Sequence, residues 1–146
     1  YDASEQGHYY CEVSNTRNKE VATENSKYAR ITLAAQAPVI MPVAPGAEDF
    51  DEAVLSDTNC PTIEVDIDAV DHDAYYVEWL NAADKPGLKI MDEPIENGFS
   101  FNPVNYLDKI KEVDPDQGIY GKYYAVVTNH LNGSSASAQS DSFDII

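Results

Sequence analysis

The chain has 146 residues, with 26 Asp and Glu against nine Lys and Arg, so its formal net charge is −17 at pH 7. A surface this acidic repels the phosphates of nucleic acids and of anionic bilayers, which argues against both as partners. No stretch approaches the roughly 18 apolar residues of a membrane-spanning helix, so we expect no membrane insertion in this segment. With 43% hydrophobic residues and ten tyrosines, the chain can still build a packed core.

A sequence repeat links the two ends of the chain. The stretch GHYYCEVSN at 7–15 returns 114 positions later as GKYYAVVTN at 121–129. Nine identities occur between positions 7 and 31 and their counterparts, where chance would give roughly one or two. A period of this length is typical of a repeated whole domain and is too long for a solenoid unit.

The first copy is predicted to be a β-hairpin. Tyr9, Cys11 and Val13 fall on one face of a period-two pattern, which is typical of a half-buried strand. A polar turn at 15–19 and a weaker strand at 29–33 complete the hairpin. The copy that begins at residue 121 has the same pattern, so we expect each hairpin to end a domain. Residues 1–34 would then be the last two strands of a truncated domain.

A second, complete domain is predicted over residues 37–146. The Ala- and Pro-rich run AAQAPVIMPVAP leads into it, so we assign residues 35–45 as a linker and first edge strand. Alternation of apolar residues predicts two central strands near 63–67 and 75–80. The residues expected to face the core are Ile63, Val65, Ile67, Tyr75, Val77 and Trp79.

Shorter elements fill the rest of this domain. Strands are predicted at 88–91 and 99–101, and one helical turn at 107–113, which Asp114-Pro115 should stop. Many short strands with closely spaced turns indicate an all-β fold, a β-sandwich.

The motif Glu5-x-Gly7-x-Tyr9-x-Cys11-x-Val13 resembles the strand F signature of immunoglobulin-like domains, and Trp79 stands where their core tryptophan is expected. The segment GKYYAVVTNHLNG is similar to the end of tandem immunoglobulin-like modules of bacterial cell-surface and cell-wall proteins. The resemblance covers residues 37–146 and the last two strands of a preceding unit. It implies a Greek-key sandwich.

The resemblance also implies a core signature, made by Trp79, Tyr123, Ala125 and Ile67. Ala125 stands at the usual strand F cysteine and Ile67 at its strand B counterpart, so apolar residues replace both halves of the usual bridge. Ile119 replaces the acidic residue of the motif, so we expect the corner near Tyr123 to be built differently, by residues 116–118.

Two readings of Cys11 stay open. The resemblance implies a disulfide to a segment absent from this chain, whereas a buried free thiol is the alternative. A bridge between Cys11 and Cys60 is the less favoured pairing, because it needs the two fragments to meet.

Acidic clusters at 46–52, 66–73 and 114–118 suggest calcium, with Asp68, Asp71 and Asp73 as the candidate ligands. The alternative, which we favour, is a solvated acidic surface without a cofactor. The three histidines are scattered and no cysteine joins them at zinc-ligand spacing. No nucleophile motif is present, so we predict no catalytic residues and no enzyme.

Four tyrosines, at positions 10, 76, 120 and 124, are predicted to be exposed. Tyr76 and Tyr124 are the candidates for an aromatic platform that binds a sugar or a protein. The alternative is that such rings form cross-strand pairs on a sheet face.

These patterns predict a non-catalytic extracellular module, a structural spacer or adhesive unit on the surface or cell wall of a bacterium. Its expected partners are neighbouring immunoglobulin-like domains and a host protein or glycan. The alternative is a carbohydrate- or protein-binding accessory module of a secreted enzyme. Because the first hairpin would leave apolar residues uncovered, we also expect residues 1–33 to dock on another chain, to exchange strands in a dimer, or to belong to a longer molecule.

Overall fold

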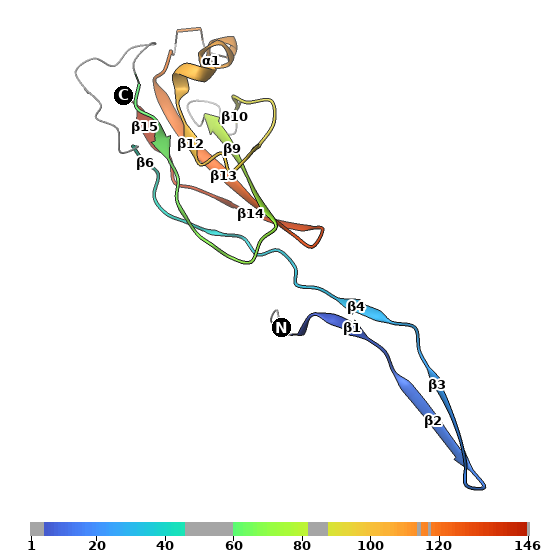
Figure 1. Ribbon diagram of the computed structural model, residues 1–146. Coiled ribbons are helices and arrows are strands. Elements are labelled where there is room, and N and C mark those ends of the chain that lie inside the picture. The colour runs from blue at the N-terminus through green and yellow to red at the C-terminus, as the bar shows by residue number, and fades with distance from the viewer. Residues whose placement is uncertain (1–4, 46–59, 82–87, 114, 117, 146) are drawn as a thin grey trace. The chain divides into compact units, whose positions relative to one another are not determined.

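The computed structural model describes residues 5–45, 60–81, 88–113, 115–116 and 118–145. The chain divides into two compact units, Tyr1–Ala34 and Ala35–Ile146. The described residues are mostly β-strand and include one short α-helix, which confirms the all-β prediction (Figure 1).

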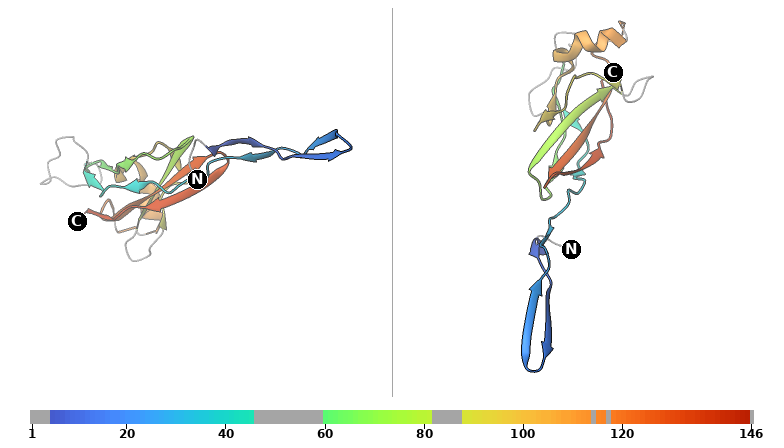
Figure 2. Two further views of the ribbon diagram at one scale, coloured as in Figure 1. Left: turned by 90° about the horizontal axis from the view of Figure 1, so that it is seen from below. Right: turned by 90° about the vertical axis from the view of Figure 1, so that its right-hand side faces the viewer.

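The first unit is one long antiparallel hairpin, drawn in blue in Figure 2. Its outer strands β1 and β4 pair with each other, and its inner strands β2 and β3 do the same. Asn18 and Lys19 form the turn with φ of 50° and 65°, the left-handed pair that suits a tight two-residue hairpin loop. The strands are β1 (Gly7–Tyr9), β2 (Glu12–Arg17), β3 (Glu20–Asn25) and β4 (Ala29–Ile31).

The second unit contains a six-stranded sheet built around two long neighbours, β9 and β13, which lie side by side in Figures 1 and 2. Their ladder runs from the Tyr123–Asn81 pair to the His130–Ala74 pair. β14 and β15 pair with β13, while β10 and β11 pair with β9. The strands are β9 (Ala74–Asn81), β10 (Leu88–Lys89), β11 (Ile95–Glu96), β13 (Gly121–Leu131), β14 (Ser134–Gln139) and β15 (Phe143–Ile145).

Shorter strands form the opposite layer. β7 lies between β6 and β12 in a three-stranded sheet, which we call the small sheet. β5 pairs separately with β8. The 3-10 helix η3 runs directly into the α-helix α1. The elements are β5 (Val39–Ile40), β6 (Ala44–Pro45), β7 (Ile63–Glu64), β8 (Ile67–Asp68), β12 (Ser100–Phe101), η3 (Pro103–Tyr106) and α1 (Leu107–Val113).

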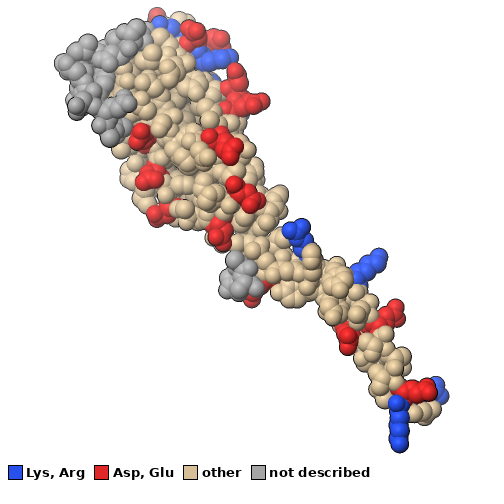
Figure 3. Space-filling view, in the orientation of Figure 1, with Lys and Arg blue, Asp and Glu red and all other residues tan. Residues whose placement is uncertain are grey.

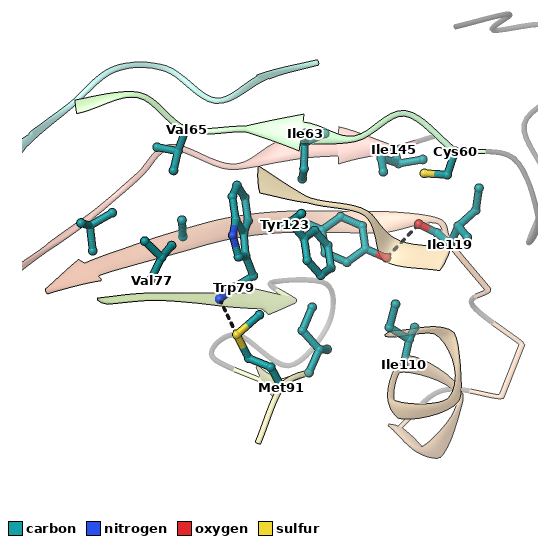
Figure 4. Packing of buried hydrophobic residues seen from close by; sticks show 14 of the residues in the cluster. Cys60, Ile63, Val65, Val77, Trp79, Met91, Ile110, Ile119, Tyr123 and Ile145 are labelled. Atoms are coloured by element: carbon teal, nitrogen blue, oxygen red, sulfur yellow. Dashed lines mark hydrogen bonds between the residues drawn. The ribbon is translucent and has the colours of Figure 1, made fainter. Parts of the chain in front are cut away.

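The hydrophobic core lies between these two layers (Figure 4). The Trp79 ring stacks on Phe101 with centroids 5.3 Å apart, and Phe101 contacts the Tyr123 ring at the same distance. The large sheet supplies Trp79 and Tyr123, and the small sheet supplies Phe101. Ile110 of α1 closes one end of the cluster with 1% of its surface exposed. Aromatic contacts of this kind add to the free energy that apolar burial already provides.

Most predicted elements of the second unit are confirmed. Tyr75, Val77 and Trp79 are buried in the core as the alternation required. Strands form within 88–91 and 99–101, although each is only two residues long, and α1 has the predicted bounds 107–113.

Ile67 departs from its expected place. The predicted single strand at 63–67 changes partners after Val65, because β7 pairs with β6 and β12 whereas β8 pairs with β5. Ile63 and Val65, which precede this change of partner, are buried, at 0% and 3% exposure. Ile67 is only half-buried and packs at the margin of the cluster.

Candidate functional site

Two hairpins with the same internal geometry are the candidate functional feature: the first hairpin, residues 7–31, and the closing hairpin, residues 121–145. Every paired position of the first recurs in the closing hairpin 114 residues later, from the Gly7–Ile31 pair with its Gly121–Ile145 counterpart to the pairs beside the turn. Both turns also place two successive residues at positive φ.

A tyrosine anchors the start of each hairpin. The Tyr9 hydroxyl donates to the backbone carbonyl of Glu5 at 2.6 Å, and the Tyr123 hydroxyl donates to that of Ile119 at 2.8 Å. This bond is therefore the same in both copies, although we expected the replacement by Ile119 to change the corner. Position 117 of the segment 116–118, to which we assigned the corner, lies outside the described residues. The acceptor is a backbone carbonyl, so the change of side chain from Glu to Ile does not affect this bond.

A serine bridges the gap between the two ladder segments in each hairpin. The Ser26 hydroxyl accepts the N–H of Cys11 at 2.8 Å, and the Ser140 hydroxyl accepts the N–H of Ala125 at the same distance. Ser26 also donates its backbone N–H to the carbonyl of Cys11 at 2.7 Å. Ser140 does the same to the carbonyl of Ala125 at 2.8 Å. The serine thus satisfies backbone groups where the regular ladder is interrupted.

A hydroxyl pair crosses the inner strands of both hairpins. Ser14 and Thr23 lie 3.1 Å apart, oxygen to oxygen, and Thr128 and Ser137 lie 2.7 Å apart. The residue types are exchanged between the two copies, yet the bond persists, because either hydroxyl can donate.

Asn129 connects the closing hairpin to the beginning of the second unit. Its side chain is 0% exposed, and its amide nitrogen donates to the carbonyl of Gln36 at 2.9 Å and to that of Asp71 at 3.0 Å. The N–H of Ala35 donates to the Ser134 hydroxyl at 2.7 Å. These bonds fix the chain where it enters this unit. Sequence reasoning missed this role, although the match of Asn15 with Asn129 on the core-facing side of a strand was a signal.

The calcium candidates do not form a common site in the part of the chain that is described. Asp68 pairs with Val39 in the β5–β8 ladder, and the Asp73 carboxylate accepts the N–H of Asn132 at 2.8 Å. Asp71 is exposed before β9 and offers its backbone carbonyl to Asn129. Among the described residues no group of three His, Cys, Asp or Glu side chains could hold a metal ion. The cluster at 46–52 lies outside the described residues, as do positions 114 and 117 of the third.

The two tyrosines proposed as a platform have different surroundings. Tyr76 is half-exposed and meets the His130 ring edge-on, with centroids 5.0 Å apart. Tyr124 is only 7% exposed, so its predicted exposure was wrong. The register sets Tyr124 directly opposite Leu80, which is also 7% exposed, and two large apolar side chains at one rung shield each other from water.

Tyr10 and Tyr120, the other two tyrosines predicted to be exposed, are exposed. Tyr10 is 50% exposed and lies edge-on to Tyr28, with centroids 5.2 Å apart. This is the cross-strand pair that we gave as the alternative to a platform. Tyr120 is 42% exposed.

Both cysteines are free thiols. Cys11 is exposed in the first unit, whereas Cys60 is buried in the core of the second. Burial disfavours the thiolate and raises the pKa of Cys60 to about 11. Ala125, which stands at the position of Cys11 in the closing hairpin, is 0% exposed and lies in register with Trp79.

A cleft of about 290 Å³ opens beside the small sheet. Its polar groups come from Glu64, Asp66 and Ser100, and the Ser100 hydroxyl donates to the Glu64 carboxylate at 3.5 Å. The lining residues are Pro42, Ala44, Glu64, Val65, Asp66, Phe99 and Ser100.

No family model matches the chain, and searches of curated proteins and of solved structures return no match. Across the described residues, none of the helices has the length and apolar character needed to cross a membrane.

Proposed function

We propose that residues 35–146 are an immunoglobulin-like sandwich that acts as a non-catalytic structural spacer in an extracellular protein of a bacterial surface. The strand arrangement supports the sandwich. β9, β13 and the β14–β15 segment would correspond to strands C, F and G of such a domain, and β6, β7 and β12 to strands A, B and E. The stacked rings of Trp79 and Phe101 join the two layers where a sandwich has its core.

The observation that carries the spacer role is the position of the two ends of this unit. Ala35 and Gln36 are bonded to Ser134 and Asn129, near one end of β13. The last strand, β15, pairs with Gly121–Tyr123 at the opposite end of β13. At about 3.4 Å per residue, these attachment points lie roughly 25–30 Å apart along the strand. A module with this geometry separates whatever precedes and follows it.

Two further observations agree with a spacer. The first hairpin repeats the backbone register and anchoring bonds of the closing hairpin, as expected for modules of one kind in series. Acidic side chains are spread over the visible face of the described part of the second unit in Figure 3. A distributed negative charge keeps neighbouring modules soluble and limits their self-association.

A binding module of a secreted enzyme is less well supported. That hypothesis used Tyr76 and Tyr124 as a pair of exposed rings, and Tyr124 is buried. Tyr76 is left with His130 as its neighbouring ring. The spacer is therefore the preferred function.

Mechanical unfolding of the full chain tests the spacer role. Pulling along the long axis of the unit, from residue 35 to residue 145, loads the bonds between the strands together. Pulling from Ala74 to His130, which pair at one end of the β9–β13 ladder, opens that ladder one rung at a time. We expect the axial direction to give the higher rupture force. Its length gain should be roughly 350 Å, the extended length of about 112 residues less the folded span. Axial rupture at an equal or lower force would contradict a load-bearing spacer.

A further inference from the structure

The first hairpin and the closing hairpin differ in how much of each is covered. Every residue from 7 to 31 is exposed. In the closing hairpin eight positions are buried, although its backbone register is the same. The buried positions are Tyr123, Tyr124, Ala125, Val127, Asn129, Leu131, Ser140 and Ile145.

The sequence identities between the hairpins concentrate at these covered positions. Six of the eight buried residues of the closing hairpin are identical in the first hairpin, and the exceptions are Ala125 and Leu131. Of the ten exposed positions only one is identical, Asn132, which matches Asn18 in the turn. The first hairpin therefore keeps the residues that a packing partner needs and varies those that face water.

We propose that the first hairpin is a docking surface for a polypeptide segment of the same kind as residues 35–120. The surface is made by Tyr9, Cys11, Val13, Asn15 and Ile31, the counterparts of five buried residues of the closing hairpin. The occupant adds an antiparallel strand to β2, as β9 adds to β13, and lays a second sheet over Val13. This inference uses the repeat that supports the proposed function, but it does not depend on the spacer role.

The chemistry of the occupant follows from the covered copy. Its edge strand carries large apolar residues in alternation, as β9 carries Val77 and Trp79. It also presents two backbone carbonyls to the amide of Asn15, as Gln36 and Asp71 do for Asn129.

Two departures in the first hairpin define how the occupant differs from residues 35–120. Arg17 stands where Leu131 is buried, so the occupant offers an acidic or carbonyl oxygen at that end. Ala29 stands where the larger Phe143 packs against the core, so the occupant fills more volume there.

A second copy of this chain is a weaker occupant. Its own residues 35–120 are already covered by its closing hairpin, which belongs to the same chain and competes at high effective concentration. Strand exchange would first have to separate the ladder between β9 and β13.

A hairpin exchange tests the docking surface. Residues 121–145 of the full chain are replaced by residues 7–31, which have the same length, and Arg17→Leu and Ala29→Phe are introduced into the transplanted segment. We expect this chain to bury Trp79 and to unfold cooperatively, as followed by its fluorescence. The same exchange without the two substitutions should have a lower urea midpoint.

Matched controls separate packing from general tolerance. Within the transplanted hairpin, Val13→Asp should abolish the cooperative transition, whereas Thr23→Asp, at a position exposed in the closing hairpin, should leave it in place. An unfolded exchange chain, or equal tolerance of the two aspartates, would overturn the proposal. The axial pulling experiment uses the native closing hairpin, so its outcome stays independent of this result.

A second measurement keeps the first hairpin in its native position. A copy of residues 35–120 is fused ahead of Gly7 in the full chain, with Arg17→Leu and Ala29→Phe. Amide exchange at 7–31 should slow by at least about 100-fold relative to the unfused chain. Unchanged exchange would count against the surface. Dimerisation of the unmodified chain that Val13→Asp abolishes would assign the surface to a second copy and refute the proposed occupant.

Discussion

The two hairpins of this protein make the same local bonds in different surroundings. The Tyr9 and Tyr123 hydroxyls each reach a carbonyl four residues upstream, and Ser26 and Ser140 each bridge the ladder. Yet Tyr9 is 47% exposed and Tyr123 is 0% exposed. Hydrogen bonds and turn chemistry are thus enough to define the geometry of the hairpin. Coverage by β9 and the small sheet determines how much each side chain contributes to stability.

The largest expected contrast is between Val127→Asp and Val13→Asp. Val127 is 0% exposed and Val13 is 64% exposed, although both occupy the same position of the hairpin. A buried, unpaired carboxylate should lower the free energy of unfolding of the second unit by about 4 kcal/mol or more. The exposed substitution should change it by less than about 0.5 kcal/mol.

Urea unfolding followed by Trp79 fluorescence measures this contrast, because the only tryptophan of the chain lies in the second unit. Equal losses for the two aspartates would show that the second unit depends on the first hairpin in a way that these contacts do not explain.

The next effect is expected from pH and concerns the two thiols. Cys60 has a pKa of about 11 when folded, against 9.0 for an unperturbed thiol. The folded state therefore favours the neutral thiol. This contribution is complete below pH 9 and is lost as the pH rises from 9 toward 11, on the order of 2 kcal/mol.

The measurement is the unfolding free energy of the native chain and of Cys60→Val from pH 8 to 11. The difference between the two chains isolates the contribution of Cys60, because the tyrosines titrate equally in both. Cys11→Val is the matched control, since Cys11 is exposed. A pH dependence that is the same in all three chains would rule out desolvation of Cys60 as its cause.

The smallest contrast is between Tyr123→Phe and Tyr9→Phe. Removing the Tyr123 hydroxyl leaves the carbonyl of Ile119 without this donor in a buried setting, which should cost about 1–2 kcal/mol. The exposed carbonyl of Glu5 can bond to water, so Tyr9→Phe should have almost no effect on the Trp79 transition. If Tyr123→Phe also left the unfolding midpoint unchanged, the corner bond would have no role in stability.

The sequence predicted the strands better than it predicted their surroundings. The alternation of Tyr75, Val77 and Trp79 correctly gave the core face of β9, and Asp114-Pro115 correctly gave the end of α1. Exposure of Tyr124 was wrong because alternation separates the two faces of a strand and does not show that both are covered. Ile67 was placed too deep because the same pattern continues past Val65, where the chain changes its partner strand.

What the sequence determined by itself is therefore local: the period of each strand, the left-handed turns, and a hairpin that occurs twice at an interval of 114 residues. The tertiary structure decided which copies of those residues are buried and gave Asn129 its two carbonyl acceptors. The physical reason is that strand period and turn geometry depend on neighbouring residues. Burial depends on whichever distant segment covers the face, and a local pattern does not identify that segment.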